Sequence, residues 1–378
     1  MDETRLTRRA MTAQGTLTID LDAIARNWRK LAASAAPAEC AAVVKADAYG
    51  LGAARVVPTL AAAGCRTFFV ATLDEGVAVR EALRTAEASV YVLSGTPRGA
   101  EGDFIAHRLR PVLNSLADVE RWVAAGRRNG KAIPAALHID TGMSRLGLDE
   151  HEQKAVCVDA SLLADLDLAL VMSHLACADE PDHPLNEEQR ARFAAVTASL
   201  PSVPASLANS AGIFLKPAYH LHLVRPGVAL YGGAPVRGVP NPMEGVVRLA
   251  VRILQVREID SPRTVGYGAT YQAHEPTRIA TVAAGYADGY PRSLSNRGQG
   301  VIAGHVVPLV GRVSMDLSTF DVSAVPAAKL AQATSIELIG PDLPIDAVAA
   351  AAGTIAYEIL TSLGHRYHRV YVGGTPPC

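Results

Sequence analysis

The stretch TFFVATLDEGVAVREALRTAEASVYVL at residues 67–93 contains the unit from which the fold can be predicted. Its two ends, residues 67–72 and 89–93, are apolar and rich in β-branched and aromatic residues, as buried strands are. Residues 74–86 between them have the composition and apolar spacing of a helix. The stretch therefore predicts a strand, a helix and a second strand, and two strands joined in this way normally lie parallel.

The same alternation runs through residues 21–233. Further helical patterns occupy residues 115–129 and 186–199. The other candidate strands are residues 41–46, 109–113, 135–140, 166–173, 204–209 and 221–225. Eight strand–helix units in a region of this size predict an α/β fold of the (β/α)8 barrel type. An open doubly wound sheet is the competing fold, but the phosphate-binding pattern Gly-x-Gly-x-x-Gly is absent after the first strand.

The sequence changes character after residue 231. GGAPVRGVPNP at residues 232–242 is rich in Gly and Pro and is expected to link two domains. The segments beyond it predict a mainly antiparallel β domain with at most one helix, near residues 345–352. Its candidate strands are residues 246–259, 277–284, 300–313, 335–339 and 368–372. We therefore expect a barrel domain at residues 12–240 and a β domain at residues 241–378.

Charge and composition argue against several classes of protein. The 378 residues include 36 Lys+Arg and 37 Asp+Glu, and a net charge of -1 does not favour nucleic acid or an anionic membrane as partner. Five cysteines without a C-x-x-C pair argue against a disulfide framework and favour a reducing compartment. No apolar run approaches the ~18 residues of a membrane span, and residues 1–15 lack the apolar part of a secretion signal. The expected location is the cytoplasm.

The carboxyl ends of barrel strands are where an active site is expected. The first candidate strand runs into Lys45, an amine within an apolar run. A charged amine is costly there unless its pKa falls or it is committed to a covalent bond. Arg145 follows the fifth strand, and its guanidinium suits the capture of a carboxylate. The structural alternatives are a lysine at a strand end and an ordinary surface arginine.

The next three strand ends carry further candidates. His174 follows the sixth strand and Ser210 the seventh, and the eighth ends in Arg225, Gly227 and Val228. Small residues and backbone N–H groups after strands seven and eight match the place where barrels commonly hold a phosphate. A reactive lysine together with a phosphate site points to pyridoxal phosphate, or to a sugar phosphate in an aldolase.

A metal site is the alternative interpretation of the segment after the sixth strand. His174 and Cys177 there are followed by Asp179 and His183. A cluster within one segment, without a second pair of ligands, is weak evidence for zinc. A structural histidine and a buried thiol remain the competing interpretation.

At this point the sequence resembles the alanine racemase family over nearly its whole length. The motifs in the first part are VVKADAYG (43–50), DTGMSRLG (140–147), SHLACAD (173–179), NSAG (209–212) and RPGVALYG (225–232). Those in the second part are YGATY (267–271), GYADGYPR (285–292), GRVSMD (311–316) and YEILTSLGHR (357–366). So many motifs in the same order are far more specific than any one of them.

The resemblance implies a barrel enzyme that interconverts L- and D-alanine and supplies D-alanine for peptidoglycan. It implies that Lys45 forms an internal aldimine with pyridoxal 5′-phosphate and that Tyr267 is the second catalytic base. Tyr267 would come from the partner subunit, so a homodimer with shared active sites is implied as well. The implied substrate-binding residues are Arg145 and Met315. The implied cofactor-binding residues are Lys45, Tyr49, His174, Ser210, Arg225, Gly227, Val228 and Tyr357. The residues implied to line the substrate entry are Asp179, Tyr286, Arg292, Arg312 and Ile355.

Two positions depart from the family's pattern. His138 stands where many members have a carbamylated lysine that fixes the arginine matching Arg145. Neutral His138, a bound anion or water could take that role. Ser314 stands where a cysteine is common beside the methionine, a change that bears on substrate fit.

Three other functions compete with alanine racemisation. A broad-specificity amino-acid racemase is one, although such proteins usually carry an export signal. Decarboxylases of basic amino acids share the architecture, but they use a partner-domain cysteine that is absent from GRVSMD. A non-catalytic pyridoxal-phosphate-binding protein would not need the second domain or Tyr267.

Overall fold

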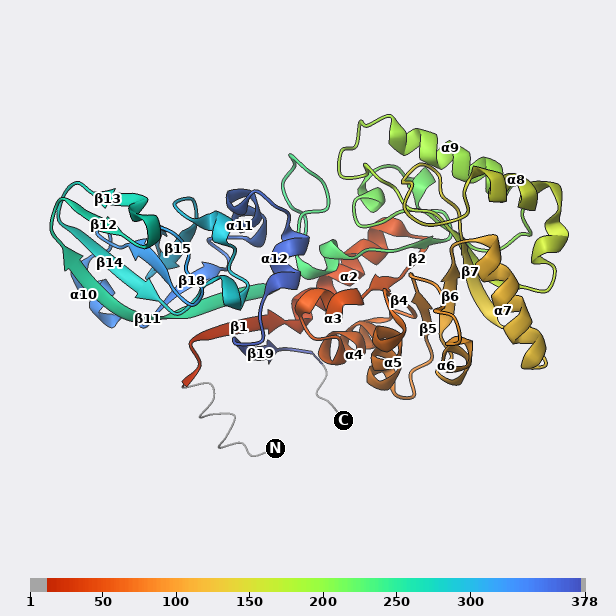
Figure 1. The fold of residues 1–378 in the computed structure, drawn as a ribbon, viewed down its shortest axis with the longest axis horizontal. Coiled ribbons are helices and arrows are strands. Elements are labelled where there is room, and N and C mark those ends of the chain that lie inside the picture. The colour runs from red at the N-terminus through yellow and green to blue at the C-terminus, as the bar shows by residue number, and fades with distance from the viewer. Residues whose placement is uncertain (1–11, 375–378) are drawn as a thin grey trace. The chain divides into compact units, whose positions relative to one another are not determined.

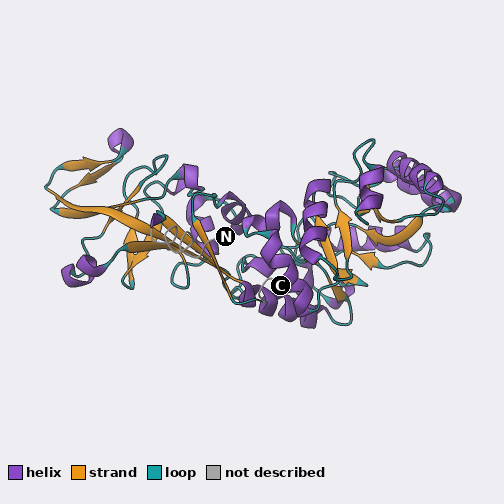
Figure 2. Ribbon diagram, turned by 90° about the horizontal axis from the view of Figure 1, so that it is seen from below, coloured by secondary structure: helices purple, strands orange, loops and turns teal. Residues whose placement is uncertain are grey.

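The computed structural model describes residues 12–374 and divides them into two compact units (Figures 1 and 2). Ile24–Leu230 and Ala234–Met243 form the first, here called the barrel unit. Residues 12–23, Tyr231–Gly233 and Glu244–Gly374 form the second, the β unit. Cys378 and most of the segment assessed for a secretion signal lie outside the described residues. Within residues 12–374, no helix has both the length and the apolar character needed to cross a membrane.

A curled parallel sheet forms the centre of the barrel unit (Figure 1). Its seven strands follow one another in chain order: β3 (Ala42–Val43), β4 (Thr67–Val70), β5 (Ser89–Val92), β6 (Arg110–Leu113), β7 (Pro134–His138), β8 (Asp167–Met172) and β9 (Ala205–Ser206). Every pair in it is parallel. The three strands predicted around residues 67–93 and 109–113 are therefore neighbours in the sheet.

Strand β10 (Leu223–Val224) joins the last strand of this sheet to the first. It pairs in parallel with β2 (Glu39–Cys40). On its other side Arg225 N donates to Ala208 O at 2.9 Å, just beyond β9. Val43 N of β3 donates to Pro226 O at 2.9 Å. These bonds complete the parallel ring, and the predicted (β/α)8 class is confirmed.

The helices of the barrel unit alternate with its strands. They are α2 (Leu21–Ala35), α3 (Lys45–Gly50), α4 (Ala53–Ala63), α5 (Leu73–Leu83), α6 (Glu101–Ala106), α7 (Leu116–Arg128), α8 (Glu150–Val158) and α9 (Leu185–Thr197). The N-terminus of α5 is fixed by a capping box between Thr72 and Glu75. After β9 the chain forms only short 3-10 turns, η2 (Gly212–Phe214) and η3 (Pro217–Tyr219).

The β unit has a mainly antiparallel sheet around the long strand β11 (Val247–Ile259). Its other strands are β1 (Gly15–Asp20), β14 (Thr277–Val282), β15 (Gln299–Ile302), β16 (His305–Pro308), β17 (Ser318–Asp321), β18 (Ser335–Ile339) and β19 (His368–Val372). Strands β12 (Arg263–Val265) and β13 (Tyr271–Ala273) form a separate hairpin. The predicted antiparallel β architecture is confirmed.

Three details of the β unit differ from the sequence-based expectation. Strand β1 precedes the barrel in sequence but pairs with β11 and β19 of this sheet. The single strand expected over residues 300–313 is a hairpin, because the chain turns through Ala303 and Gly304 at positive φ. The predicted helix is α11 (Ile345–Ala352), but α10 (Ala327–Gln332) and α12 (Ala356–Ser362) are helical too. Both are too short for helical periodicity to be visible in the sequence.

Candidate active site

Lys45 lies just beyond β3 and opens a left-handed turn. The next four residues, Ala46, Asp47, Ala48 and Tyr49, have φ between 53° and 57°. This conformation costs an L-amino acid about 1–2 kcal/mol per residue. Only interactions with the surroundings can hold four such residues in sequence.

Side chains at both ends hold this turn in place. Ala46 N donates to Glu75 Oε1 at 2.7 Å, and Ala53 N donates to Asp47 Oδ1 at 2.6 Å. Within the turn Ala48 N donates to Val44 O at 2.9 Å. The direction in which Lys45 leaves the strand is therefore set by contacts on either side of it.

The environment of Lys45 lowers its pKa. Burial is the main cause, the positive charge of Arg145 acts in the same direction, and Glu75 opposes both. Arg145 belongs to a loop folded around Asp140, whose Oδ1 accepts from the backbone N–H groups of Gly142, Met143 and Ser144 at 2.9, 3.0 and 3.1 Å. A lysine with lowered pKa is a better nucleophile and base near neutral pH.

Arg225 is a buried cation fixed on several sides. It is only 3% exposed. Its guanidinium donates to Ser206 Oγ, to Ser173 O at 2.5 Å and to His174 Nδ1 at 3.4 Å. Burial lowers the pKa of Arg225 to about 9, so it remains charged at neutral pH. Burial, and then the charge of Arg225, lower the pKa of His174 well below its usual value, so this imidazole is neutral.

The barrel residues expected at a phosphate lie together. Ser210 Oγ accepts from Gly227 N at 2.8 Å and from Ala229 N at 3.3 Å. The hydroxyl of Tyr49 lies against Gly227, where a Cβ would approach within 2.2 Å of it. Val228 follows as the first residue of η4 (Val228–Tyr231) and is fully buried. Two hydroxyls and adjacent backbone N–H groups after the last barrel strands have the donor chemistry that a phosphate requires.

His138, the first departure from the family's pattern, is buried and neutral. Its Nδ1 lies 2.8 Å from Asn114 Oδ1, and an amide oxygen only accepts, so the proton is assigned to Nδ1. Burial, followed by the charge of Arg225, lowers its pKa to about 4. His138 therefore offers Nε2 as an acceptor on its other side.

Gln189 is a buried connection that the sequence did not reveal. It has no exposed surface. Its Nε2 donates to His174 O at 2.9 Å and to Thr141 Oγ1 at 3.2 Å, and its Oε1 accepts from Ala176 N at 2.8 Å. It thereby fixes the loop that precedes Arg145 to the loop that carries His174. A glutamine on a helix gives no sequence signal for this role.

The candidates of the β unit form a second group on exposed loops. Tyr267 in η5 (Tyr267–Ala269) is 72% exposed. The guanidinium carbon of Arg312 lies close enough to Gly268 that a Cβ there would be 3.1 Å from it. Tyr286 N donates to Ser314 O at 3.0 Å, and Ala287 N to Met315 O at 2.9 Å. Tyr267, Arg312, Tyr286 and Met315 thus come from adjoining loops.

Arg366 braces two of these loops. Its Nε lies 2.9 Å from Asp288 Oδ1 and its Nη1 lies 2.8 Å from Asp316 Oδ1. Asp288 Oδ2 also accepts from Gly285 N at 2.9 Å. These three charged residues lie inside the motifs quoted above, but no role was predicted for them.

The remaining candidates are Asp179 in the barrel unit and Arg292, Ile355 and Tyr357 in the β unit. Asp179 forms an ion pair with Arg237 at 2.7 Å within the barrel unit. Exposed Arg292 opens η7 (Arg292–Leu294). Ile355 and Tyr357, at the start of α12, are 52% and 40% exposed.

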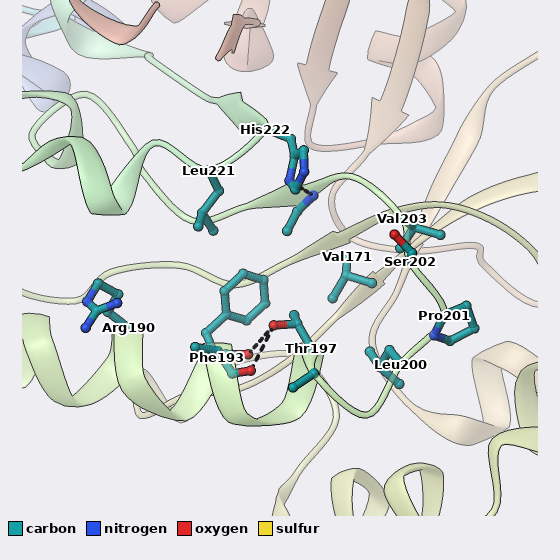
Figure 3. A pocket seen from close by; sticks show the side chains of 13 residues that line it. Val171, Arg190, Phe193, Thr197, Leu200, Pro201, Ser202, Val203, Leu221 and His222 are labelled. Carbon is teal, nitrogen blue, oxygen red and sulfur yellow. Dashed lines mark hydrogen bonds between the residues drawn. The ribbon is translucent and has the colours of Figure 1, made fainter. Parts of the chain in front are cut away.

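Each unit contains a cavity. One of about 440 Å³ lies between α9 and the segment that leads to β9 (Figure 3). Val171, Phe193 and Leu200 are among its lining residues, and it contains no candidate residue. The other, of about 520 Å³, is in the β unit and includes Tyr286 and Glu358. Across residues 12–374, no group of three or more His, Cys, Asp or Glu is placed to hold a metal, so the metal interpretation of His174 and its neighbours gains no support.

Comparison with known proteins gives consistent matches over nearly the whole chain. Residues 19–235 match the model of the alanine racemase N-terminal domain, and residues 246–371 that of the C-terminal domain. An alanine racemase of Rhodospirillum rubrum is 57% identical over 96% of both chains. A catabolic alanine racemase of Agrobacterium fabrum is 51% identical over 95% of this chain and 92% of its own.

Solved structures agree with these sequence matches. The alanine racemase of Bartonella henselae, with covalently bound pyridoxal phosphate, has a TM-score of 0.90 and 41% identity, covering 95% of this chain and 100% of that one. The biosynthetic alanine racemase of Pseudomonas aeruginosa has a TM-score of 0.88 and 35% identity, covering 96% and 100%.

Proposed function

Since the chain belongs to the alanine racemase family, we propose that it interconverts L- and D-alanine with pyridoxal phosphate, and that Lys45 and Tyr267 are the two groups that exchange the Cα proton. The observation that carries the assignment is Lys45 on its constrained turn, with a lowered pKa and a hydroxyl-rich cluster after the last barrel strands. This combination suits a lysine that binds an aldehyde cofactor bearing a phosphate.

The residues of the barrel unit fit this cofactor. Within the barrel unit its phosphate would be held by Tyr49, Ser210, Gly227 and Val228. Tyr357, which belongs to the β unit, is proposed as a further ligand. Gly227 already contacts both Tyr49 and Ser210, and a side chain larger than hydrogen at position 227 would fill the space against Tyr49. When bound, pyridoxal phosphate supplies the electron-withdrawing system that acidifies the Cα–H bond of an amino acid.

Arg225 and His174 would set the electrostatics at the cofactor ring. Arg225 is held by Ser206, Ser173 and His174 in one orientation. We assign it to the pyridine nitrogen, where a guanidinium that keeps its proton leaves that nitrogen unprotonated. A weaker electron sink of this kind favours racemisation over transamination.

The reaction needs two proton-exchanging groups on opposite faces of the substrate. One group must remove the Cα proton, and the other must return a proton to the opposite face. A single side chain could do both only by moving from one face of the substrate to the other. The Lys45 amine and the Tyr267 phenol are assigned to these faces. Arg145 would bind near the substrate carboxylate and Met315 would contact the substrate through its backbone. Asp179, Tyr286, Arg292, Arg312 and Ile355 would line the entry.

We also propose a homodimer in which the β unit of one subunit completes the site of the other. Supporting this, Tyr267, Tyr286, Met315, Ile355 and Tyr357 of the β unit are between 40% and 72% exposed, and exposed apolar side chains that gather in one region mark interaction surfaces. A partner that covers them would remove this apolar surface from water. Analytical ultracentrifugation over a series of protein concentrations measures the oligomeric state. If racemase activity is lost on dilution together with the dimer, the result supports active sites shared between subunits.

A division into two domains near residues 240–241, with residues 12–23 belonging to the β unit, a cytoplasmic location and a role in peptidoglycan supply complete the proposal. Near-balanced charge and five cysteines without a C-x-x-C pair support the location. D-alanine formed in the cytoplasm would be available for cell-wall precursors.

The direct test is incubation of the purified protein with pyridoxal phosphate and L-alanine, followed by chiral separation of the products. D-alanine should accumulate until the two enantiomers are equal. Parallel reactions with other L-amino acids separate a strict from a broad-specificity racemase. Release of carbon dioxide without D-alanine would indicate a decarboxylase, and an imine absorbance without turnover would indicate a binding protein.

A further inference from the structure

We propose that Glu75 is a positioning residue for Lys45: its carboxylate holds the first peptide of the left-handed turn and thereby aims the reactive amine. The proposal rests on the function given above for Lys45. Glu75 lies 29 residues after Ala46, in the first turn of α5.

The two oxygens of Glu75 serve two different segments. Oε1 accepts from Ala46 N, the peptide directly after Lys45, at 2.7 Å. Oε2 accepts from Ala71 N at 2.7 Å and from Thr72 N at 3.3 Å, where β4 passes into α5. One carboxylate thus ties the reactive turn to the neighbouring strand and helix of the barrel.

The conformation of the turn makes this tie necessary. Ala46 is the first of the four residues with positive φ, and Asp47 fixes the other end through Ala53 N. Without an acceptor for Ala46 N, the residue would be free to relax toward the right-handed region, which L-amino acids prefer. Because Lys45 is its direct neighbour, that relaxation would turn the amine away from the ligand.

The charge of Glu75 also acts on Lys45. Burial and Arg145 lower the pKa of the amine, and Glu75 raises it. Lys45 also interacts with His174, which is neutral. Removal of the negative charge should therefore shift the titration of Lys45 to lower pH.

Glu152 provides a matched control. It forms the capping box of α8 with Asp149, as Glu75 does for α5 with Thr72. Its Oε2 accepts from Asp149 N at 3.2 Å and its Oε1 from Leu116 N at 2.8 Å. Both glutamates are half-buried, but the second oxygen of Glu152 binds the start of α7 instead of the turn after Lys45.

The test follows the capture of pyridoxal phosphate by the full-length protein after its cofactor has been removed. The rate at which the imine absorbance appears is recorded as a function of pH for wild type, Glu75→Gln, Glu75→Asp and Glu152→Gln. For Glu75→Gln we expect the plateau rate to fall roughly tenfold, the effect of one lost charge-assisted hydrogen bond, and the midpoint to move to lower pH. Glu75→Asp should slow capture but keep the wild-type midpoint, because it keeps the charge.

Glu152→Gln should lose as much thermal stability as Glu75→Gln does. It should match wild type in the plateau rate of imine formation and in the pH at the midpoint. If Glu75→Gln matches Glu152→Gln in both measurements, the proposal is overturned. Should Glu75→Gln not fold, Glu75→Asp decides alone, since an unchanged capture rate in that variant contradicts the positioning role.

These readouts do not depend on turnover of alanine. A wild-type protein that captures the cofactor but does not racemise alanine would refute the proposed function and leave the Glu75 comparison valid. Hydrogen exchange of the peptide that covers residues 43–51 adds a structural readout. It should accelerate in Glu75→Gln and not in Glu152→Gln.

Discussion

The hydroxyl of Tyr49 lies against the Cα of Gly227, so that a Cβ on residue 227 would stand 2.2 Å from Tyr49 Oη. Gly227→Ala must therefore displace Tyr49 or the backbone that also bonds to Ser210. We expect the affinity for pyridoxal phosphate to fall by roughly tenfold or more, the equivalent of one lost charge-assisted contact. Equilibrium titration of the cofactor-free protein measures this. Gly102→Ala is the control, because a Cβ on Gly102 has no atom within 4 Å.

The buried guanidinium of Arg225 makes Ser206 a sensitive position. Ser206 Oγ donates to Leu223 O at 2.6 Å and accepts from Arg225. Ser206→Ala leaves a buried charged donor and a buried carbonyl each short of a partner. We expect a loss of about 1–3 kcal/mol in the free energy of unfolding, measured by urea denaturation. A loss below a few tenths of a kcal/mol would mean that water replaces the hydroxyl at no cost.

His138 should make stability depend on pH in the acidic range. Its pKa is lowered to about 4 in the folded protein, first by burial and then by Arg225, while an unfolded histidine titrates near 6.5. The unfolded chain then binds the proton more tightly, so the stabilisation is complete above about pH 6.5 and is lost as the pH falls toward 4. The difference integrates to the order of 3 kcal/mol.

His138→Gln is the variant that isolates this contribution. Its free energy of unfolding should fall less between pH 6.5 and 4 than that of wild type. His174 contributes to both curves, and its contribution differs between them only through the charge of His138, which helps to lower the pKa of His174. Urea denaturation at several pH values within this range gives the two curves. Parallel curves would show that His138 has the same proton affinity in the folded and the unfolded protein.

The stretch at residues 67–93 was predictable because its pattern is long and strongly periodic. The expected strand, helix and strand appear as β4, α5 and β5. The clustering of Lys45 with Arg145 and His174 was also predictable in outline, since the carboxyl ends of parallel strands meet at one edge. Sequence periodicity was sufficient wherever burial of one face decided the structure.

The left-handed turn after Lys45 could not be predicted. Ala46, Asp47 and Ala48 have no preference for positive φ, and the acceptor for Ala46 N is Glu75, far along the chain. The conformation is thus imposed by tertiary contacts against local preference. The same holds for Gln189. It can connect the loops of Thr141 and His174 only after the fold has brought both loops next to its helix.

The brace formed by Arg366 should affect substrate more than cofactor. It joins Asp288, in the loop of Tyr286, to Asp316, beside Met315. Arg366→Ala should raise the KM for alanine several-fold and leave the imine absorbance unchanged, because these loops carry the proposed substrate contacts. The control is Arg127→Ala, which removes an exposed ion pair with Asp165. Equal effects of the two variants on KM would contradict the assignment.

Tyr267→Phe tests the two-base proposal directly. The side chain is 72% exposed, so loss of its hydroxyl should leave folding and the imine of Lys45 intact. Racemisation needs both faces, and we expect it to fall by at least 100-fold, the range over which a positioned acid–base group acts. In deuterated water the Cα proton of one alanine enantiomer should still exchange through Lys45, and that of the other should not. Tyr271→Phe in the same hairpin, whose hydroxyl lies 3.4 Å from Asp321 Oδ2, is the matched control and should retain activity. Exchange of both enantiomers in Tyr267→Phe would mean that another group serves the second face, and loss of the imine absorbance would mean that Tyr267 supports the cofactor instead of the proton transfer.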